Sequence, residues 1–220
     1  MLTDIPAAGP APDSHEPVGT ARGAAPRPPH GTVTRAARTI TDVLQPRNVL
    51  LVGMTGVGWA PAERWTGILW GLFGALCAGV IPAGYVEWHR KRGTWGDRHV
   101  VDRTQCAPIF LVILSSIGVG LAVMSLGHAP ADVITAMIAS WAMTIVLLAV
   151  NTGWKISVDA AVASSAVAIL AVVHSPWWAC AYLLVAAVCW SRVVLAYHTT
   201  AQTLAGATLG ATTAMAFLVP

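Results

Sequence analysis

The sequence predicts an all-α fold, a polytopic transmembrane helix bundle of six to seven helices with a disordered N-terminal tail. Of its 220 residues, 55% are hydrophobic and only 10% are charged, whereas a soluble domain of this size carries roughly a quarter charged residues. Long uncharged runs follow one another from about residue 44 to the C-terminus. None alternates like a barrel strand, and a helix satisfies its own backbone hydrogen bonds in lipid.

The N-terminal segment, residues 1–40, differs in composition from everything that follows. It is rich in Ala, Pro, Gly, Thr and Arg and contains no apolar run. Such a segment cannot bury enough surface to offset the entropy of ordering it. It also lacks the charged-then-apolar order of a signal peptide. We therefore expect a disordered tail over residues 1–40 and one transmembrane domain over residues 41–220.

The apolar runs define the expected helices of the bundle. They cover residues 44–60, 65–86, 108–126, 133–150, 156–173, 177–195 and 202–219. Crossing the hydrocarbon core takes about 20 residues, and the first run is short and broken by Pro46, Arg47 and Asn48. The prediction is therefore six or seven spans. The glycines at 67, 71 and 74 and at 206 and 210 predict close contacts between helices.

Basic residues give the expected orientation in the membrane. They precede or open the first run and crowd the segment after the second, at Arg22, Arg27, Arg35, Arg38, Arg47, His89, Arg90, Lys91, Arg92, Arg98 and Arg103. The loops on the opposite side hold one arginine, Arg64. The positive-inside rule then places the N-terminus and the 87–107 loop in the cytoplasm. The sequence predicts an integral protein of the plasma membrane.

Composition also narrows the partners and cofactors. A net charge of +3 gives no reason to expect nucleic-acid binding. The four cysteines form no CxxC pair and no Cys/His cluster, so we expect neither disulfides nor a thiolate metal site. No other metal or cofactor is predicted, and the partner we expect is the lipid bilayer. The sequence does not determine an oligomeric state.

Two polar segments interrupt the apolar runs near the C-terminus. One is Lys155-Ile-Ser157-Val-Asp159, and the other begins at Ser191-Arg192 and ends at His198. By the predicted topology both lie at the cytoplasmic face. A guanidinium grips a phosphate bidentately, a lysine adds a point charge, and a hydroxyl with helix N-terminal amides completes the cradle. The pattern predicts a phosphate-ester site at the edge of the bilayer.

In order and spacing these segments resemble the signatures of the type 2 phosphatidic acid phosphatases, an integral membrane family. That family carries Lys-x6-Arg-Pro, then Ser-Gly-His, then Ser-Arg-x5-His-x3-Asp. Here the third signature reads Ser191-Arg192-Val-Val-Leu-Ala-Tyr-His198-Thr-Thr-Ala-Gln202. The second reads Ser157-Val-Asp159 after Lys155, and the first would fall between Arg90 and Pro108. The resemblance covers the chain from about residue 65 to its end.

The resemblance implies a mechanism and a set of roles. His198 would attack phosphorus and form a phosphohistidine. Arg192, Lys155, Ser157 and Ser191 would bind the phosphate. Asp159 stands where the family has the histidine that protonates the leaving group, and Gln202 stands where an Asp orients the nucleophile. Cys106-Ala107-Pro108 stands in place of an Arg-Pro pair.

Structural roles compete with these catalytic ones. Thr199-Thr-Ala-Gln202 fits a capping box that opens the last helix. Lys155 and Asp159 are spaced as a helical i,i+4 ion pair. Arg192 and Lys155 also fit interfacial anchors whose charged ends reach the headgroups.

Three functions follow from the sequence. The first is a hydrolase of lipid or polyprenyl phosphates and diphosphates that acts through His198. The second is an isoprenoid cyclase on the same fold, with Asp159 as proton donor and tryptophan faces that stabilise cations. The third is an inactive relative that binds lipid phosphates without turnover.

Overall fold

The computed structural model describes residues 31–59, 64–92 and 103–217, which are helical apart from short connections. The helices are α1 (Thr32–Val43), α2 (Pro46–Gly58), α3 (Arg64–Ala75), α4 (Ile81–Lys91), α5 (Arg103–Leu126), α6 (Ala131–Gly153), α7 (Val158–Val173), α8 (Tyr182–Val194) and α9 (Thr200–Thr212). A π-helical turn, η2 (Leu76–Val80), joins α3 to α4, and 3₁₀ turns η3 (Pro176–Ala181) and η4 (Thr213–Phe217) precede α8 and follow α9. These ranges contain no strand. The predicted all-α class is confirmed.

Four helical segments of the described part are long and apolar enough to cross a membrane. They are Arg64–Lys91, Pro108–Leu126, Ala131–Gly153 and Pro176–Val194. Each of the seven predicted apolar runs contains a helix, but α2 has 13 residues and α7 has 16, fewer than the about 20 that a span takes. These helices are typical of an integral membrane protein. Four helical segments are long enough to cross the membrane.

The helix α1 covers the last part of the segment that the composition predicts to be a disordered tail. Residues 32–40 are helical, and residues 1–30 of that segment lie outside the described ranges. Ala37 and Thr41 are buried on the face that packs on α8, where the Thr41 hydroxyl donates to Ser191 Oγ at 3.4 Å. The remaining surface of α1 is largely exposed. The composition of this segment does not predict a helix, and the contact with α8 holds α1 in place.

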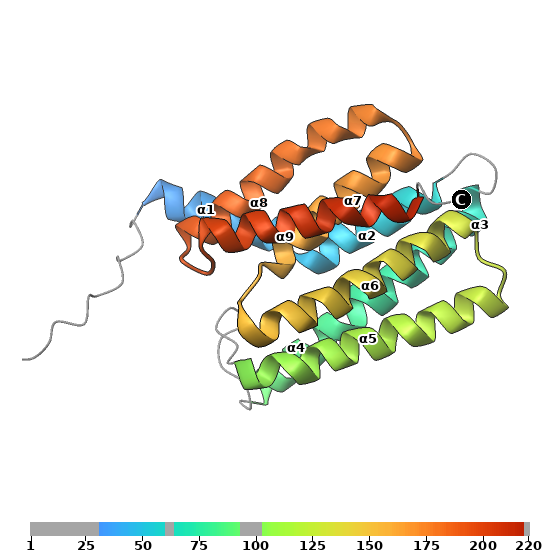
Figure 1. Cartoon of the computed structure of the whole chain (residues 1–220), viewed down its shortest axis with the longest axis horizontal. Helices are drawn as coiled ribbons and strands as arrows, with labels where there is room; N and C mark the ends of the chain where they lie inside the picture. The colour runs from blue at the N-terminus through green and yellow to red at the C-terminus, as the bar shows by residue number, and fades with distance from the viewer. Residues whose placement is uncertain (1–30, 60–63, 93–102, 218–220) are drawn as a thin grey trace, which may run out of the picture.

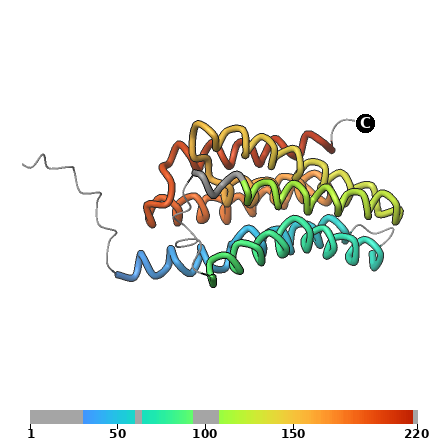
Figure 2. Tube along the Cα trace, turned by 90° about the horizontal axis from the view of Figure 1, so that it is seen from below, coloured from blue at the N-terminus to red at the C-terminus, as the bar shows by residue number. Residues whose placement is uncertain are grey.

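The helices form two layers (Figure 2). One layer contains α1 to α4 and the other contains α5 to α9. In Figure 1, α7, α8 and α9 lie side by side on one half of the molecule, and α5 and α6 lie on the other. The connections from α6 to α7 and from α8 to α9 reach the same end of the bundle as the junction of α1 and α2 (Figure 1).

Glycines set how closely several helices approach. A Cβ on Gly206 or Gly210 of α9 would collide with the carbonyl oxygen of Ser157 or Ala161 in α7. The Ser164 hydroxyl then fastens the same pair of helices by donating to the Ala207 carbonyl at 2.6 Å. The predicted contact at the second glycine set is confirmed, and it places the start of α7 directly against α9.

Two glycines of the first set, Gly67 and Gly71, also lie against the backbone of a neighbouring helix. A Cβ on Gly67 or Gly71 of α3 would collide with the carbonyl oxygen of Gly58 or Met54 in α2. The two helices therefore form a tight hairpin within the first layer, although the connection between them lies outside the described residues.

Candidate functional site

Three chain segments are fastened together at one end of the bundle by backbone hydrogen bonds. The amide of Ser157, at the start of α7, donates to the Gln202 carbonyl at 3.2 Å. The amides of Tyr197 and His198 both donate to the carbonyl of Arg192, at 3.0 and 3.3 Å. The turn that carries them contains Ala196 at a φ of 56°, a left-handed conformation that L residues adopt at a cost. The two polar segments predicted to form a site are therefore held against each other.

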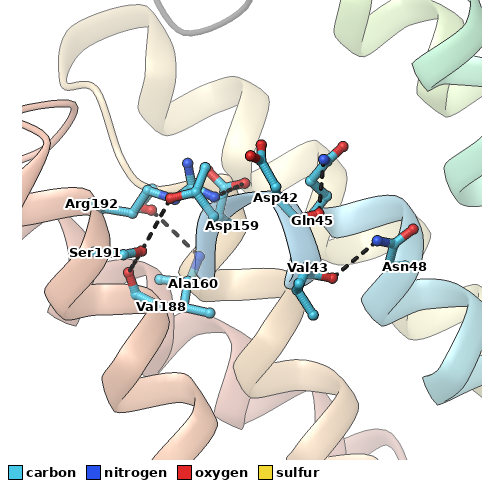
Figure 3. Close-up of polar contacts among 11 residues, drawn as sticks. Asp42, Val43, Gln45, Asn48, Asp159, Ala160, Val188, Ser191 and Arg192 are labelled. Atoms are coloured by element: carbon cyan, nitrogen blue, oxygen red, sulfur yellow. Dashed lines mark hydrogen bonds and ion pairs between the residues drawn. The ribbon is translucent and has the colours of Figure 1, made fainter. Parts of the chain in front are cut away.

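The centre of the site is an ion pair between α8 and α7. Arg192 Nη2 donates to Asp159 Oδ1 at 3.1 Å, and the two side chains point toward each other in Figure 3. Arg192 is only 1% exposed, yet its Nε and Nη1 atoms have no hydrogen-bond partner among the described residues. A buried cationic donor without a partner costs about 1–3 kcal/mol or more. Among the described residues, Arg192 therefore has more hydrogen-bond donors than its pair with Asp159 uses.

His198 is oriented by the first turn of α9. Thr199 caps that helix. Gln202 Oε1 accepts a hydrogen bond from the backbone amide of Thr199 at 3.0 Å, and the backbone amide of Gln202 donates to Thr199 Oγ1 at 3.3 Å. The predicted capping box is confirmed. The same Oε1 lies 3.3 Å from His198 Nδ1.

This contact determines the tautomer of the imidazole. Because Gln202 Oε1 accepts from a backbone amide, it is the oxygen and not the nitrogen of the side-chain amide that faces His198. His198 Nδ1 therefore donates, which leaves the lone pair on Nε2. The sequence offers capping of α9 and orientation of His198 as competing roles for Gln202. The side chain of Gln202 takes part in the capping box and also contacts His198 Nδ1.

The charges around His198 come from the predicted site residues. Burial lowers the pKa of His198 below its ordinary value, and this effect is the largest. The negative charge of Asp159 raises that pKa, the charge of Lys155 lowers it, the hydrogen bond with Gln202 raises it, and the charge of Arg192 lowers it. The net lowering favours the neutral imidazole, which is the nucleophilic form.

An apolar cavity of about 530 Å³ opens beside the ion pair. Asp159 and Arg192 line it together with Asp42, Gln45 and Arg47 from the junction of α1 and α2. The sequence did not identify the last three as site residues, because nothing in their pattern marks them. Figure 3 shows Asp42 and Gln45 beside the ion pair.

The rest of the cavity wall comes from both layers of the bundle. It is formed by Pro46, Leu50, Ala78, Gly79, Pro82, Ala83, Val86, Glu87, Ile109, Phe110, Ile113, Ile117, Ser140, Met143, Thr144, Leu147, Val158 and Val162. Most of these side chains are apolar. The cavity is thus a hydrocarbon-lined space that begins at a buried arginine.

Not every predicted site residue reaches this cavity. Ser191 is fully buried, and its hydroxyl donates to the Val188 carbonyl at 2.8 Å and accepts from Thr41. Ser157 is also fully buried and caps α7, where its Oγ accepts from the Ala160 amide at 3.4 Å. Both hydroxyls are committed to packing and capping. Neither serine lines the cavity, and neither do Lys155 and His198.

The alternative in which Lys155 and Asp159 form a helical ion pair is wrong. The helix α7 begins at Val158, so Lys155 lies in the extended connection before it and not one turn earlier on the same helix. Asp159 pairs with Arg192 instead. The reason is the N-cap at Ser157, which starts the helix after the lysine.

The segment expected to match the first phosphatase signature, between Arg90 and Pro108, falls mostly outside the described part of the chain. Residues 93–102 lie outside the described ranges, and so do the side chains of Cys106 and Ala107. The expected match at these positions therefore stays a prediction.

Within the described part of the chain, the geometry provides a buried guanidinium whose Nε and Nη1 have no partner, an imidazole whose Nδ1 faces Gln202, and an apolar cavity. The cavity with its buried arginine can bind an anionic headgroup on a hydrocarbon chain. His198 lies outside the cavity wall but near enough to Asp159 and Arg192 for their charges to influence its pKa. No protein-family model, no curated protein and no solved structure matches this chain.

Proposed function

We propose that the protein hydrolyses a membrane lipid phosphate or diphosphate, with Arg192 as the anion-binding group and His198 as the nucleophile. The observation that carries the proposal is the buried guanidinium of Arg192 at the end of an apolar cavity, whose Nε and Nη1 have no partner in the ranges that the structure describes. A phosphate supplies the acceptors that these donors need. A hydrocarbon chain matches the apolar wall beyond them.

The proposed reaction has two steps. First, Nε2 of His198 attacks phosphorus, and the bond from phosphorus to the lipid oxygen breaks. The lipid oxygen leaves with the electron pair and takes a proton from water. Second, a water molecule attacks the phosphohistidine, which releases phosphate and restores the imidazole. The Nδ1 hydrogen bond to Gln202 keeps the lone pair on Nε2 before the attack, and that pair forms the bond to phosphorus until hydrolysis returns it.

Arg192 also stabilises the charge that develops on the phosphoryl oxygens. Lys155, which is near enough to influence the pKa of His198, adds positive charge on the same side. In this account Asp159 positions Arg192. The proton-donor role expected for Asp159 fits less well, because the carboxylate accepts a hydrogen bond from Arg192.

The proposal includes a membrane arrangement. The polar ends of α2, α4, α7 and α8 would lie at the cytoplasmic face of the plasma membrane. The shorter apolar helices α2, α7 and α9 would complete six or seven spans by packing among the longer ones, which shields their ends from lipid.

A second candidate is the isoprenoid cyclase, and one observation favours it: Asp159 lies at the end of an apolar cavity. Two observations favour hydrolysis over it. Protonation of an olefin needs Asp159 as a donor, but it is an acceptor from Arg192. The described cavity wall also contains one aromatic side chain, Phe110, and no tryptophan.

The proposal is tested by phosphate release from prenyl phosphates and diphosphates with the purified protein. We expect release by the wild type and a loss of about 10³-fold or more in His198→Ala, as for removal of a catalytic nucleophile. His128→Ala is the matched control, because His128 is exposed in the loop between α5 and α6. Equal rates for wild type and His198→Ala would refute the mechanism.

The same preparations separate the other two candidates. A cyclised product that is lost in Asp159→Asn but retained in His198→Ala identifies the cyclase. Binding of lipid phosphate by the wild type without any turnover identifies the inactive relative.

A further inference from the structure

The charged side chains that line the cavity leave an anion at Arg192 short of positive charge. The described wall carries two guanidinium groups, those of Arg47 and Arg192, and three carboxylates, those of Asp42, Glu87 and Asp159. Asp159 already balances the charge of Arg192, and Glu87 pairs with an arginine on its own helix. The carboxylate of Asp42 opposes a further anion. A phosphate on Arg192 therefore needs a second cation, and the described wall offers Arg47.

Arg47 is available for this role. Its side chain is exposed and has no hydrogen bond or ion pair among the described residues. It is the second residue of α2, where no side chain caps the helix and the first turn contains no acidic residue. The amides of Asn48 and Val49 both donate to the Gln45 carbonyl, and Pro46 has no amide hydrogen.

The start of α2 therefore attracts an anion in two ways. The positive end of the helix dipole and the Arg47 amide add to the charge of the guanidinium. Arg192 gives the independent sign of a ligand at this end of the cavity, because it is 1% exposed and its Nε and Nη1 have no partner among the described residues. Two anion-binding groups thus line one cavity, one from α8 and one from α2.

The order of these groups matches a headgroup with two phosphates. Arg192 is joined to the nucleophile, because its carbonyl accepts from the His198 amide at 3.3 Å. Arg47 is followed along α2 by Leu50, which lines the apolar part of the cavity. A terminal phosphate at Arg192, an inner phosphate at Arg47 and a hydrocarbon chain beyond Leu50 would follow this sequence.

The chemistry also favours phosphate over an alcohol as the leaving group. Asp159 accepts a hydrogen bond from Arg192 and is not placed to donate a proton. An alkoxide that leaves from a monophosphate ester needs that proton, since even water has a pKa of about 15.7. A phosphate monoester loses its last proton with a pKa of about 6, so it leaves as a stable anion without a proton donor.

We propose that the cavity takes a diphosphate group, with its terminal phosphate on Arg192 and its inner phosphate on Arg47 at the start of α2. This inference rests on the proposed function for one point, that phosphate binds at Arg192. Nε2 of His198 then bonds to the terminal phosphorus, and the bond from that phosphorus to the bridging oxygen breaks. The inner phosphate departs with the electron pair, and Arg47 stabilises its charge. Water then releases the terminal phosphate from the imidazole.

The test measures binding without turnover. The probes are a prenyl monophosphonate, a methylene-bridged diphosphonate with the same prenyl chain, and methylenediphosphonate without a chain. They are added to the purified full chain in detergent, with EDTA present. The prenyl diphosphonate should bind about tenfold or more tightly than the monophosphonate, because it gains charge-assisted hydrogen bonds. Tighter binding of the prenyl than of the chain-free diphosphonate assigns a lipid diphosphate, and equal binding assigns free diphosphate.

A matched pair of variants makes the test specific to Arg47. Arg47→Gln should remove the preference for the diphosphonate and leave the affinity for the monophosphonate unchanged. Arg38→Gln removes the same charge from an exposed position on α1 that does not line the cavity, and it should keep the preference. Equal binding of the two prenyl probes by the wild type, or a preference that survives in Arg47→Gln, would overturn the inference. A preference that appears only after magnesium is added would also overturn it, because a metal ion would then hold the second phosphate.

The two proposals fail in different ways. A diphosphonate preference that depends on Arg47, without phosphate release from the matching diphosphate, contradicts hydrolysis and leaves the diphosphate site standing. Phosphate release that depends on His198 but has equal kcat/KM for monophosphate and diphosphate substrates contradicts the diphosphate site and leaves hydrolysis standing.

Discussion

Arg192 is the residue on which the site depends, because its guanidinium has more donors than its protein partner can use. One nitrogen holds Asp159, and two others are buried without a partner among the described residues. Lysine carries the same charge but concentrates it on a single nitrogen and cannot hold two anions in a fixed planar geometry. Arg192 can therefore fix Asp159 and, in the proposed function, bind a phosphate as well.

The first prediction concerns this double role. Arg192→Lys should lower phosphate release about tenfold or more, because a single ammonium group cannot serve Asp159 and the phosphate together. The measurement is kcat/KM for the preferred lipid phosphate. Arg38→Lys, on the exposed side of α1, is the control and should retain wild-type activity. An Arg192→Lys variant with unchanged kcat/KM would show that no bidentate contact is made.

The second prediction uses the pH dependence of His198. Its folded pKa is lowered from the ordinary value of 6.5, mainly by burial, so the unfolded chain binds more protons at this position. The contribution of this residue to stability is complete above the unfolded pKa and is lost as the pH falls from 6.5 through the folded pKa. His198→Gln should therefore flatten the fall in Tm over that window.

The control for the pH prediction is His128→Gln. This variant should keep the wild-type slope of Tm against pH, because His128 lies in an exposed loop. If His198→Gln shows the same slope as the wild type, the burial of His198 does not govern acid stability.

At the level of helices, the contact between α7 and α9 sets the geometry of the site. Gly206 lies against the carbonyl oxygen of Ser157, two residues before Asp159. The amide of Ser157 in turn donates to Gln202, which orients His198. A small displacement of α9 would therefore move the carboxylate, the guanidinium that it holds, and the imidazole relative to one another.

The third prediction tests this contact with a pair of glycine variants. Gly206→Ala should destabilise the protein by about 1–3 kcal/mol, because its Cβ meets backbone that cannot move aside. It should also lower phosphate release more than the loss of folded protein explains. Gly84→Ala adds the same methyl group where nothing lies within 4 Å and should stabilise α4 by about 0.5–1 kcal/mol. Thermal unfolding that is the same for both variants would contradict the close contact.

Several of these elements could be predicted from the sequence, because their signals are local. The seven apolar runs each contain a helix, and Thr199 with Gln202 forms the predicted capping box. The glycine contacts follow from small residues at helical spacing. The ion pair of Arg192 with Asp159 could not be predicted, because it joins residues 33 apart through the packing of two helices.

Other elements could not be predicted because tertiary contacts decide them. The helix α1 has the composition of a tail, and its burial against α8 is visible only in three dimensions. The start of α7 after Lys155 depends on the capping role of Ser157, which the apolar pattern does not reveal. The contribution of Asp42, Gln45 and Arg47 to the cavity depends on the angle between α1 and α2.

At the level of the whole molecule, the charged groups and the mouth of the cavity lie at one end of the bundle. Arg47, at the start of α2, lines the cavity, and the basic residues at the end of α4 lie near its other wall. The opposite end carries η3, with Trp177 and Trp178 exposed. Tryptophans of this kind sit at membrane interfaces, and the basic end is the one expected in the cytoplasm.

The fourth prediction concerns this orientation. Single cysteines are placed in a background in which the four natural cysteines are replaced by alanine. His128→Cys, between α5 and α6, should react with a membrane-impermeant thiol reagent in intact cells. Thr152→Cys, at the other end of α6, should react only after the cells are opened. The reverse pattern would place the site on the outer face.

The most direct test of the central claim is to trap the covalent intermediate on the intact protein. Purified wild-type protein is mixed with its preferred lipid phosphate, quenched within the first turnover under alkaline conditions that preserve phosphohistidine, and mapped by mass spectrometry. The account predicts one phosphoryl group on His198, absent in His198→Gln and reduced in Arg192→Lys. Hydrolysis that proceeds with no phosphoryl group on His198, or with one on another residue, would contradict it.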